Sequence, residues 1–513
     1  MESNWIDRIF EKGWSPRISA GIVIPGLFIL SVAVYYWWIA GREWARRFNK
    51  LGGPICLPFL GCGWIILNPN RIHEQIGKYG KIYKKNARFW LGHLPYFITT
   101  DVEIIEKILT NPANFEKAEA YSNSHFLVGQ GLVAASVPKW KKDRKVMLPC
   151  MKSTMFPTYL ENFNKNSAIL VEILGKIFTH DAQPSCDIRQ HFARCMIDVV
   201  FETLLDTDAK VQKCPESRFY EAFTECFHIV ESKMFLPWTK FPPLWYLLGY
   251  RDAEKKNMDI LRRTISEKMI RQKMEDWRQN NNNETDENQR LQMAHYLYQT
   301  GDYDSTDLFH QFLTVLAGGY DTTSTVLSHT IYLLALNPDI QRKLIDELDS
   351  VFEDAHRPAT PADLEQLKYL DLVLKESMRF ITPTPMLGRT LGEDLDLGMG
   401  RVVPKGCNIL VSAMHVQHDP DLWPDPEIFR PERFLTQSGN EKGTKFFSYL
   451  PFSAGPRGCF APKFAMMSVK VLLSRVLRNF TASTKKPLNT CVFQYGVVLH
   501  VLGGLPVTLH PRR

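Results

Sequence analysis

One cysteine near the end of the chain stands between a glycine-rich loop and a helix-forming run, in the stretch PFSAGPRGCFAPKFAMM at residues 451–467. The spacing F-x-x-G-x-R-x-C is formed by Phe452, Gly455, Arg457 and Cys459. Gly455 and Gly458 permit a tight loop that brings the backbone close to a flat cofactor, and Arg457 offers a planar fork of donors to a carboxylate. The free N–H groups and the dipole of the following helix favour the thiolate form of Cys459. A thiolate at the axial position of a haem iron pushes electron density onto bound oxygen and favours O–O cleavage.

The other cysteines give no comparable signal. The chain has 10 cysteines, and none of them falls in a C-x-x-C or C-x-x-H cluster that would indicate zinc or a redox pair. We expect them to be packed, reduced thiols, since most buried cysteines act as small hydrophobic residues. Reduced thiols place the body of the protein in the cytosol or on the cytosolic side of a membrane.

Size and charge narrow the classes of protein further. A length of 513 residues allows two to four domains or one large catalytic unit. The hydrophobic fraction of 45% excludes a disordered chain. The net charge of +7 is spread over interleaved acidic and basic residues, which excludes a basic tail that binds nucleic acid.

Residues 18–40 contain no charged side chain and are long enough to cross a bilayer core of roughly 30 Å as a helix. A cluster of Tyr and Trp closes this segment, as is typical of a membrane interface, and basic residues follow it. The pattern predicts a transmembrane anchor with the C-terminal body in the cytosol. A cleaved signal peptide and a buried amphipathic or core helix are the alternatives.

Helical periodicity dominates the rest of the chain, with short strand-like runs such as PYFITT and CNILVSAM between the helices. The sequence predicts a mainly α fold with small β-sheets, in one large catalytic domain behind the anchor. The expected division is a lumenal segment 1–17, the anchor 18–40, a basic and Pro/Gly-rich linker 41–70, and the catalytic domain 71–513.

A long apolar run at residues 316–338 carries two glycines, an acid and two threonines in its middle. Each glycine inside a helix costs about 1 kcal/mol relative to alanine, so a packing reason is expected for Gly318 and Gly319. A helix whose threonines bond only to their own backbone is the alternative to a functional role.

Together, the cysteine loop and this helix resemble the cytochrome P450 superfamily of haem-thiolate monooxygenases. The resemblance implies the cytochrome P450 fold, haem b with Cys459 as the iron ligand, and a helix that opens beside the iron. Asp321 and Thr322 are then the acid and the alcohol that deliver protons while oxygen is activated. Glu376 and Arg379 match an E-x-x-R pair that, with Arg433, fixes the segment before the cysteine loop.

The haem-contacting residues implied by the resemblance come from distant parts of the sequence. Trp140 and Arg144 match a W-x-x-x-R helix that holds a haem propionate, and Arg389 and Arg457 are the further propionate arginines. Within the superfamily, the chain is most similar to the family-4 group, especially its divergent insect members.

Four positions depart from the family-4 pattern. Phe460-Ala461 stands where a glycine usually comes two residues after the cysteine. Asp143 replaces a histidine that faces a propionate, so its charge would repel that group unless Arg144, Lys142 or Lys145 compensates. Gly318 replaces a glutamate that esterifies the haem, and we expect no covalent link. Tyr320 replaces a common histidine and changes the polarity of the helix beside the iron.

The implied function is insertion of one oxygen atom from O2 into an apolar substrate such as a fatty acid, a hormone-like lipid or a xenobiotic. Electrons come from NADPH through cytochrome P450 reductase, with cytochrome b5 as a further partner, at the endoplasmic reticulum membrane. Six lysines form the expected docking face: Lys139, Lys141, Lys142, Lys145, Lys463 and Lys470. The alternatives are a haem-thiolate isomerase or dehydratase, a haem-binding sensor without turnover, and a membrane scaffold without cofactor.

Overall fold

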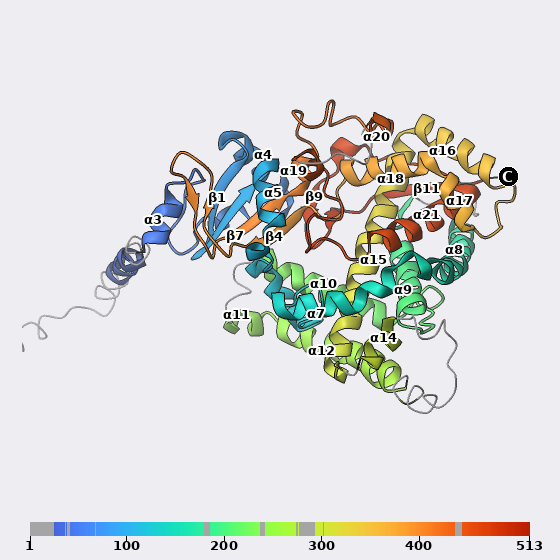
Figure 1. The fold of residues 1–513 in the computed structure, drawn as a ribbon, viewed down its shortest axis with the longest axis horizontal. Coiled ribbons are helices and arrows are strands. Elements are labelled where there is room, and N and C mark those ends of the chain that lie inside the picture. The colour runs from blue at the N-terminus through green and yellow to red at the C-terminus, as the bar shows by residue number, and fades with distance from the viewer. Residues whose placement is uncertain are drawn as a thin grey trace, which may run out of the picture.

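The computed structural model describes residues 25–35, 37, 42–66, 68–178, 185–235, 242–272, 275, 293–300, 302–436 and 444–512. Figure 1 shows a part rich in strands beside a larger helical part, with helix α15 (Ser305–Leu336) running through the helical part. The mainly α fold with small sheets that the sequence predicts is confirmed.

The largest sheet has four strands in the order β1-β2-β7-β4. Its members are β1 (Asn86–Leu91), β2 (Leu94–Thr99), β4 (Met386–Thr390) and β7 (Asn408–Ser412). β1 and β2 form an antiparallel hairpin, while β7 pairs in parallel with β2 and antiparallel with β4. Strands from the two ends of the chain therefore share one sheet.

The segment predicted as a linker packs against this sheet. It contains α3 (Glu43–Asn49), in which Ala45 and Phe48 are buried beside residues of β1, β2 and β7. Residues 51–66 then run along β1, where Cys62 donates its N–H to the carbonyl of Trp90. The boundary at residue 70 stays a prediction.

The helical part is built around α15, which is buried over most of its length. The Asp304 side chain caps its first turn by accepting from the Asp307 N–H at 2.7 Å. Four helices that matter for the site follow: α8 (Phe156–Phe178), α9 (Arg189–Leu204), α10 (Arg218–Phe235) and α21 (Pro462–Asn479). α9 lies along α15, and α8 packs against both α9 and α21.

The remaining elements complete the two parts. Among the described residues, the other α-helices are α4 (Ile72–Ile82), α5 (Val102–Thr110), α6 (His125–Val128), α7 (Val137–Met147), α11 (Pro242–Leu247), α12 (Tyr250–Arg262), α14 (Met293–Gln299), α16 (Pro338–Val351), α17 (Pro361–Gln366), α18 (Lys368–Phe380), α19 (Ala413–Val416) and α20 (Arg433–Thr436). The small sheets are β3 (Cys186–Asp187) with β11 (Pro506–Pro511) and β8 (Phe480–Ser483), β5 (Leu395–Asp396) with β6 (Val402–Val403), and β9 (Phe493–Tyr495) with β10 (Leu499–Val501).

The predicted membrane anchor falls only partly on described residues. Within 18–40 the structure describes residues 25–35 and Trp37, all helical, and the rest of the segment lies outside the described residues. In the part of the chain that is described, no helix is both long and apolar enough to span a bilayer.

A buried ion cluster fixes the chain that leads to the cysteine loop. The Glu376 carboxylate accepts from Arg379 Nε at 2.8 Å and from Arg433 Nε at 3.0 Å. Arg379 also donates to the Gln417 carbonyl, and Gln417 Oε1 accepts from the Leu450 N–H at 2.8 Å. The structural role that the resemblance implies for these three charged residues is confirmed, because the cluster holds the backbone directly before Pro451.

Candidate active site

The cysteine loop is folded by its own backbone and by α5. Cys459 donates its N–H to the Phe452 carbonyl at 2.9 Å, and Gly458 donates to Gly455 at 3.0 Å. Gly455 has a φ of +71°, and a Cβ there would collide with the carbonyl oxygen of Leu109. The sequence predicts that this glycine serves the approach to a cofactor; in the structure, the left-handed turn and the contact with α5 require it.

The thiol of Cys459 faces a cavity directly before α21. Ala461 donates its N–H to Cys459 Sγ at 3.4 Å. Burial raises the pKa of the Cys459 thiol, while the Ala461 amide and the Arg144 guanidinium act in the opposite direction. The expected helix-terminus effect is present, but in the protein alone desolvation outweighs it.

Cationic side chains gather beside this loop. Arg144 Nη1 donates to the Gly458 carbonyl at 3.0 Å, which ties α7 to the loop. The Arg457 guanidinium lies 4.6 Å from the centre of the buried Trp140 ring and donates one N–H to Ala135. Arg389 on β4 donates from Nη1 to the Gly388 carbonyl. Arg389 lies near this group, since burial, together with the charge of Arg389, lowers the pKa of Arg457. Arg389 and Arg457 are both buried.

Lys117 is a further cation that the sequence did not indicate. It lines the same cavity, and its Nζ lies 4.4 Å from the centre of the Tyr121 ring. Burial, together with Arg389 and Arg457, lowers the pKa of Lys117 well below its ordinary value. Lys117 belongs to no local motif, so only the folded chain brings it to the arginines.

These cations lack the negative charge that such a cluster needs. Arg389 Nε and Nη2 and Arg457 Nη1 are buried without a hydrogen-bond partner. Among the described residues, no carboxylate forms an ion pair with Lys117, Arg144, Arg389 or Arg457. Burying charges without partners is costly, so the cluster is built for an anionic group supplied from outside the chain. The two propionates of a haem fit this requirement, as the Cys459 thiol fits its iron.

The cavity has a volume of about 740 Å³ and connects the cysteine loop with α15. Cys459, Phe460 and Ala461 line it on one side, and Gly318 and Thr322 line it on another. Many of its other walls are apolar side chains, including Leu127, Val230, Met234, Val326, Leu387 and Val498. Ala461 has a φ of −123°, so the missing glycine at this position leaves no backbone strain.

The two adjacent glycines of α15 have different roles. A Cβ on Gly319 would approach Val200 Cγ2 of α9 to 2.7 Å, whereas a Cβ on Gly318 would meet no atom within 4 Å. Gly319 is thus the packing glycine that the sequence predicts, and Gly318 leaves open space toward the cavity. The Thr322 hydroxyl donates to the Gly318 carbonyl at 2.8 Å, which is the bond to its own helix backbone expected if Thr322 had no functional role. Thr322 nevertheless lines the cavity.

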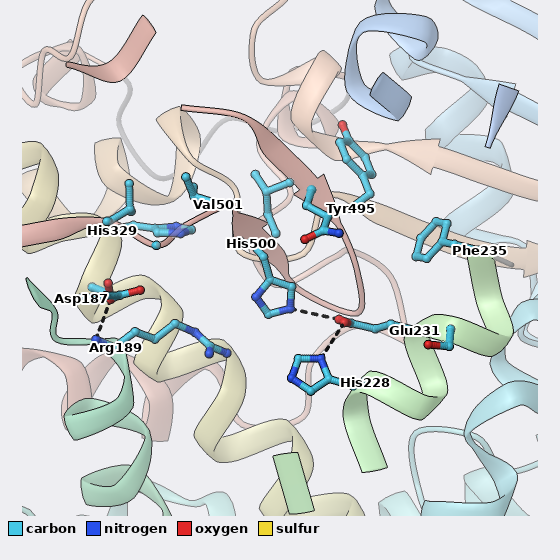
Figure 2. A pocket seen from close by; sticks show the side chains of 15 residues that line it. Asp187, Arg189, His228, Glu231, Phe235, His329, Tyr495, His500 and Val501 are labelled. Carbon is cyan, nitrogen blue, oxygen red and sulfur yellow. Dashed lines mark hydrogen bonds and ion pairs between the residues drawn. The ribbon is translucent and has the colours of Figure 1, made fainter. Parts of the chain in front are cut away.

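Asp321 lines the larger cavity, and its partner Arg189 lines a second, more polar cavity of about 490 Å³. Its carboxylate forms an ion pair with Arg189 at the start of α9. Burial raises the pKa of Asp321, and Arg189 opposes this shift. The Arg189–Asp321 ion pair therefore lies between the two cavities, with Arg189 at the cavity shown in Figure 2 and Asp321 at the larger one.

Glu231 and two histidines, His228 and His500, form a cluster on the other side of the polar cavity, which we call the carboxylate clasp. Figure 2 shows His228 and His500 pointing at Glu231 from two sides. His500 Nε2 lies 3.0 Å from Glu231 Oε1, His228 Nδ1 lies 3.8 Å from Oε2, and the Val497 N–H donates to Oε1 at 3.1 Å. The clasp joins α10 to the β9–β10 hairpin, and both elements also wall the larger cavity.

Two of the departures from the family-4 pattern turn away from the cavity. Asp143 is fully buried and accepts from Tyr303 Oη at 2.9 Å and from Gln311 Nε2 at 2.7 Å, with Lys139 Nζ at 3.4 Å. Its charge is thus held by Tyr303, Gln311 and Lys139, in place of the three cations that the sequence suggested as compensation.

Tyr320 is the second such departure. It is buried against Phe223 and Phe227 of α10, with ring centres 5.2 and 5.6 Å apart. Tyr320 is not among the residues that line the larger cavity. The tyrosine thus strengthens the contact between α10 and α15, and the expected change in the polarity beside the iron is not seen.

The predicted docking lysines divide into two groups. Three of them form ion pairs: Lys139 with Asp307 at 3.1 Å, Lys142 with Asp302 at 3.1 Å and Lys470 with Asp371 at 2.7 Å. Lys141, Lys145 and Lys463 are exposed. Because Arg144 bonds to the cysteine loop, the exposed lysines of α7 lie on a helix fixed to that loop.

Comparisons with known proteins agree with this geometry. A family model described as Cytochrome P450 matches residues 51–504. Cytochrome P450 4V2 of Homo sapiens is 29% identical over 533 residues, covering 100% of this chain and 99% of the relative. Its counterpart in Mus musculus is 30% identical over 487 residues, covering 92% and 91%. Probable cytochrome P450 4d20 of Drosophila melanogaster is 30% identical over 524 residues, covering 96% and 99%.

Proposed function

The chain belongs to the cytochrome P450 family as a monooxygenase, and from this we propose that it inserts one atom of O2 into an apolar substrate at the endoplasmic reticulum membrane. The electrons come from NADPH through a flavoprotein reductase, with cytochrome b5 as a further donor. The observation that carries this proposal is the cavity of about 740 Å³, since its apolar walls join Cys459 to Thr322. Apolar pockets with a few convergent polar groups are typical sites for small molecules.

The cationic cluster is suited to hold the cofactor. Arg389 and Arg457 have three free N–H-bearing nitrogens between them, and Lys117 and Arg144 line the cavity beside them. These groups would bind the propionates, and Cys459 would ligate the iron. A haem held with a thiolate ligand supplies the oxygen-activating chemistry.

Asp321 and Thr322 would deliver the protons, because both line the larger cavity. Asp321 pairs with Arg189, which lines the polar cavity, so the pair connects that cavity with the wall of the larger one. The Thr322 hydroxyl is oriented by the Gly318 carbonyl at the wall of the larger cavity. Protons would pass from Asp321 to the cavity through the Thr322 hydroxyl.

The reductase is expected to dock on the side of the cysteine loop. Lys141, Lys145 and Lys463 offer exposed positive charge there, which steers an acidic partner. A transmembrane helix at 18–40 would hold the catalytic domain on the cytosolic face, close to a reductase in the same membrane.

The apolar walls of the larger cavity suit several classes of lipid and lipid-like substrate. Fatty acids, terpenoid hormones, steroids and xenobiotics all fit apolar walls. Resemblance to the family-4 group favours fatty acyl chains among these classes.

The deciding measurement is the absorption spectrum of the reduced, CO-bound protein. We expect the red-shifted Soret band of a thiolate-ligated haem, and its loss in Cys459→Ser. A folded protein that binds haem without this shift would refute the proximal ligand. NADPH-dependent turnover of a lipid panel then tests the rest: Thr322→Ala should consume electrons with less product, and unchanged coupling would remove Thr322 from the mechanism.

A further inference from the structure

Two cysteines that are far from any C-x-x-C motif meet at the base of a tight hairpin. Leu57 and Gly61 exchange backbone hydrogen bonds of 2.7 and 2.8 Å, and Cys56 and Cys62 flank this pair. Their sulfur atoms lie 3.1 Å apart. Both cysteines are free thiols, as the sequence predicts, and a tight turn brings them together.

The two thiols have different surroundings. Cys62 is fully buried, whereas Cys56 is only half-buried. Arg88 Nη1 lies 3.3 Å from Cys56 Sγ, and Arg88 Nε is held by the Leu51 carbonyl at 2.9 Å. The hydrogen bond from Cys62, together with Arg88, lowers the pKa of Cys56, while that same bond and burial raise the pKa of Cys62. Cys56 is thus the more accessible and more nucleophilic thiol.

We propose that Cys56 and Cys62 are a reversible redox pair that forms a disulfide by exchange with a small disulfide such as oxidised glutathione. The Cys56 thiolate attacks one glutathione sulfur, which forms a mixed disulfide and releases one glutathione thiolate. That thiolate takes up the Cys62 proton, and Cys62 then attacks Cys56 Sγ and releases the second glutathione. Two protein thiols are oxidised, one glutathione disulfide is reduced to two thiols, and no other reagent is consumed.

The geometry makes the bond accessible. A disulfide has a sulfur separation of about 2.05 Å, so the two atoms must approach by only about 1 Å. The hairpin bonds between Leu57 and Gly61 already hold the two cysteines in register.

Oxidation would act on the rim of the substrate cavity. Phe59, Leu60 and Cys62 line the larger cavity, and Phe59 is 46% exposed at the surface. A covalent link at the base of the hairpin would restrict the movement of this rim. In a reducing compartment such a disulfide is transient, and its population follows the ratio of oxidised to reduced glutathione.

The test uses the full-length, haem-loaded protein. It is incubated with oxidised glutathione, the remaining thiols are alkylated, and tryptic peptides are analysed by mass. Both cysteines fall on one peptide, residues 51–71, because no Lys or Arg lies between them. We expect this peptide to lack both alkyl groups and to carry an internal disulfide that dithiothreitol removes.

Single variants establish the order of attack. Cys62→Ser should accumulate a mixed disulfide of glutathione on Cys56, and Cys56→Ser should leave Cys62 unmodified. In the Cys62→Ser background, Arg88→Gln should slow glutathionylation of Cys56, since the thiolate loses its cationic partner.

The exposed Cys214 serves as the internal control for reagent access. The proposal fails if Cys214 is glutathionylated while residues 51–71 keep two free thiols. It also fails if that peptide carries two glutathiones instead of an internal bond. Neither outcome depends on catalytic turnover, so the monooxygenase proposal is unaffected by it.

Discussion

Replacement of Asp143 decides between two roles for this residue, since the sequence places it beside a propionate and the structure buries it among polar partners. Asp143→Ala would leave the Tyr303 hydroxyl and the Gln311 amide without their acceptor. Hydrogen bonds to a charged group contribute about 1.5–3 kcal/mol each, and breaking a buried charged cluster costs about 3–5 kcal/mol. We therefore expect Asp143→Ala to lower the free energy of unfolding by about 3–5 kcal/mol.

The assay is urea unfolding of the haem-bound protein, followed in parallel by far-UV circular dichroism and by the Soret band. Asp143→Asn keeps an acceptor for one partner and should cost about 1 kcal/mol. Lys142→Ala is the matched control on the same helix, because Lys142 is exposed and its ion pair with Asp302 lies near the surface. Its effect should stay within about 0.5 kcal/mol.

The opposite result would refute the structural role. If Asp143 faced a propionate, removal of its charge would strengthen haem binding and leave unfolding unchanged. A lower haem dissociation rate in Asp143→Ala, at unaltered urea midpoint, would show that the carboxylate acts on the cofactor.

The other predictions concern the walls of the two cavities. Gly319→Ala should destabilise the protein by about 1–3 kcal/mol, because the added methyl group overpacks against α9. At Gly318 the added methyl group meets no atom within 4 Å, so Gly318→Ala should stabilise the protein by up to about 1 kcal/mol through helix propensity. Equal urea midpoints for the two variants would contradict this difference. Glu231→Gln should return the pKa of His228 from its raised value toward 6.5, measured by NMR of the imidazole. The stability that the pair gains from protonated His228 is fully present below pH 6.5 and is lost as the pH rises through the raised pKa of His228. The stability gained from the ionised Glu231 carboxylate is present above pH 4.5 and is lost as the pH falls toward the lowered pKa of about 2. Lys117→Met should release haem to apomyoglobin about tenfold faster if one charge-assisted bond is lost, and an unchanged rate would exclude Lys117 from the propionate site.

The sequence was sufficient for the cysteine loop and for the arginines beside it because local motifs mark those residues, whereas Lys117 belongs to no motif. Cys459 and Arg457 belong to one loop, and the Glu376 cluster belongs to one helix and one short downstream motif. Local spacing does not fix the direction of a side chain around a helix axis. Asp143 and Arg144 are adjacent, yet one points into the core and the other to the cavity.

Contacts between distant segments were also beyond the sequence. Arg189 meets Asp321 only because α9 packs along α15. The Cys56–Cys62 pair depends on the conformation of a loop, and Lys117 depends on how the chain before α6 folds over β4. Such positions follow from the packing of the whole chain, and no local motif in the sequence marks them.

The contact between Gly455 and Leu109 sets a condition on the order of biosynthesis. Leu109 leaves the ribosome early, but the loop that packs on it lies within the last 60 or so residues of the chain. Until the cysteine loop is synthesised, it cannot cover the apolar cavity walls that α6, α10 and α15 contribute. A nascent chain must therefore keep this surface from aggregating through most of translation, and ribosome-bound chains truncated before Cys459 should crosslink to chaperones and retain no haem.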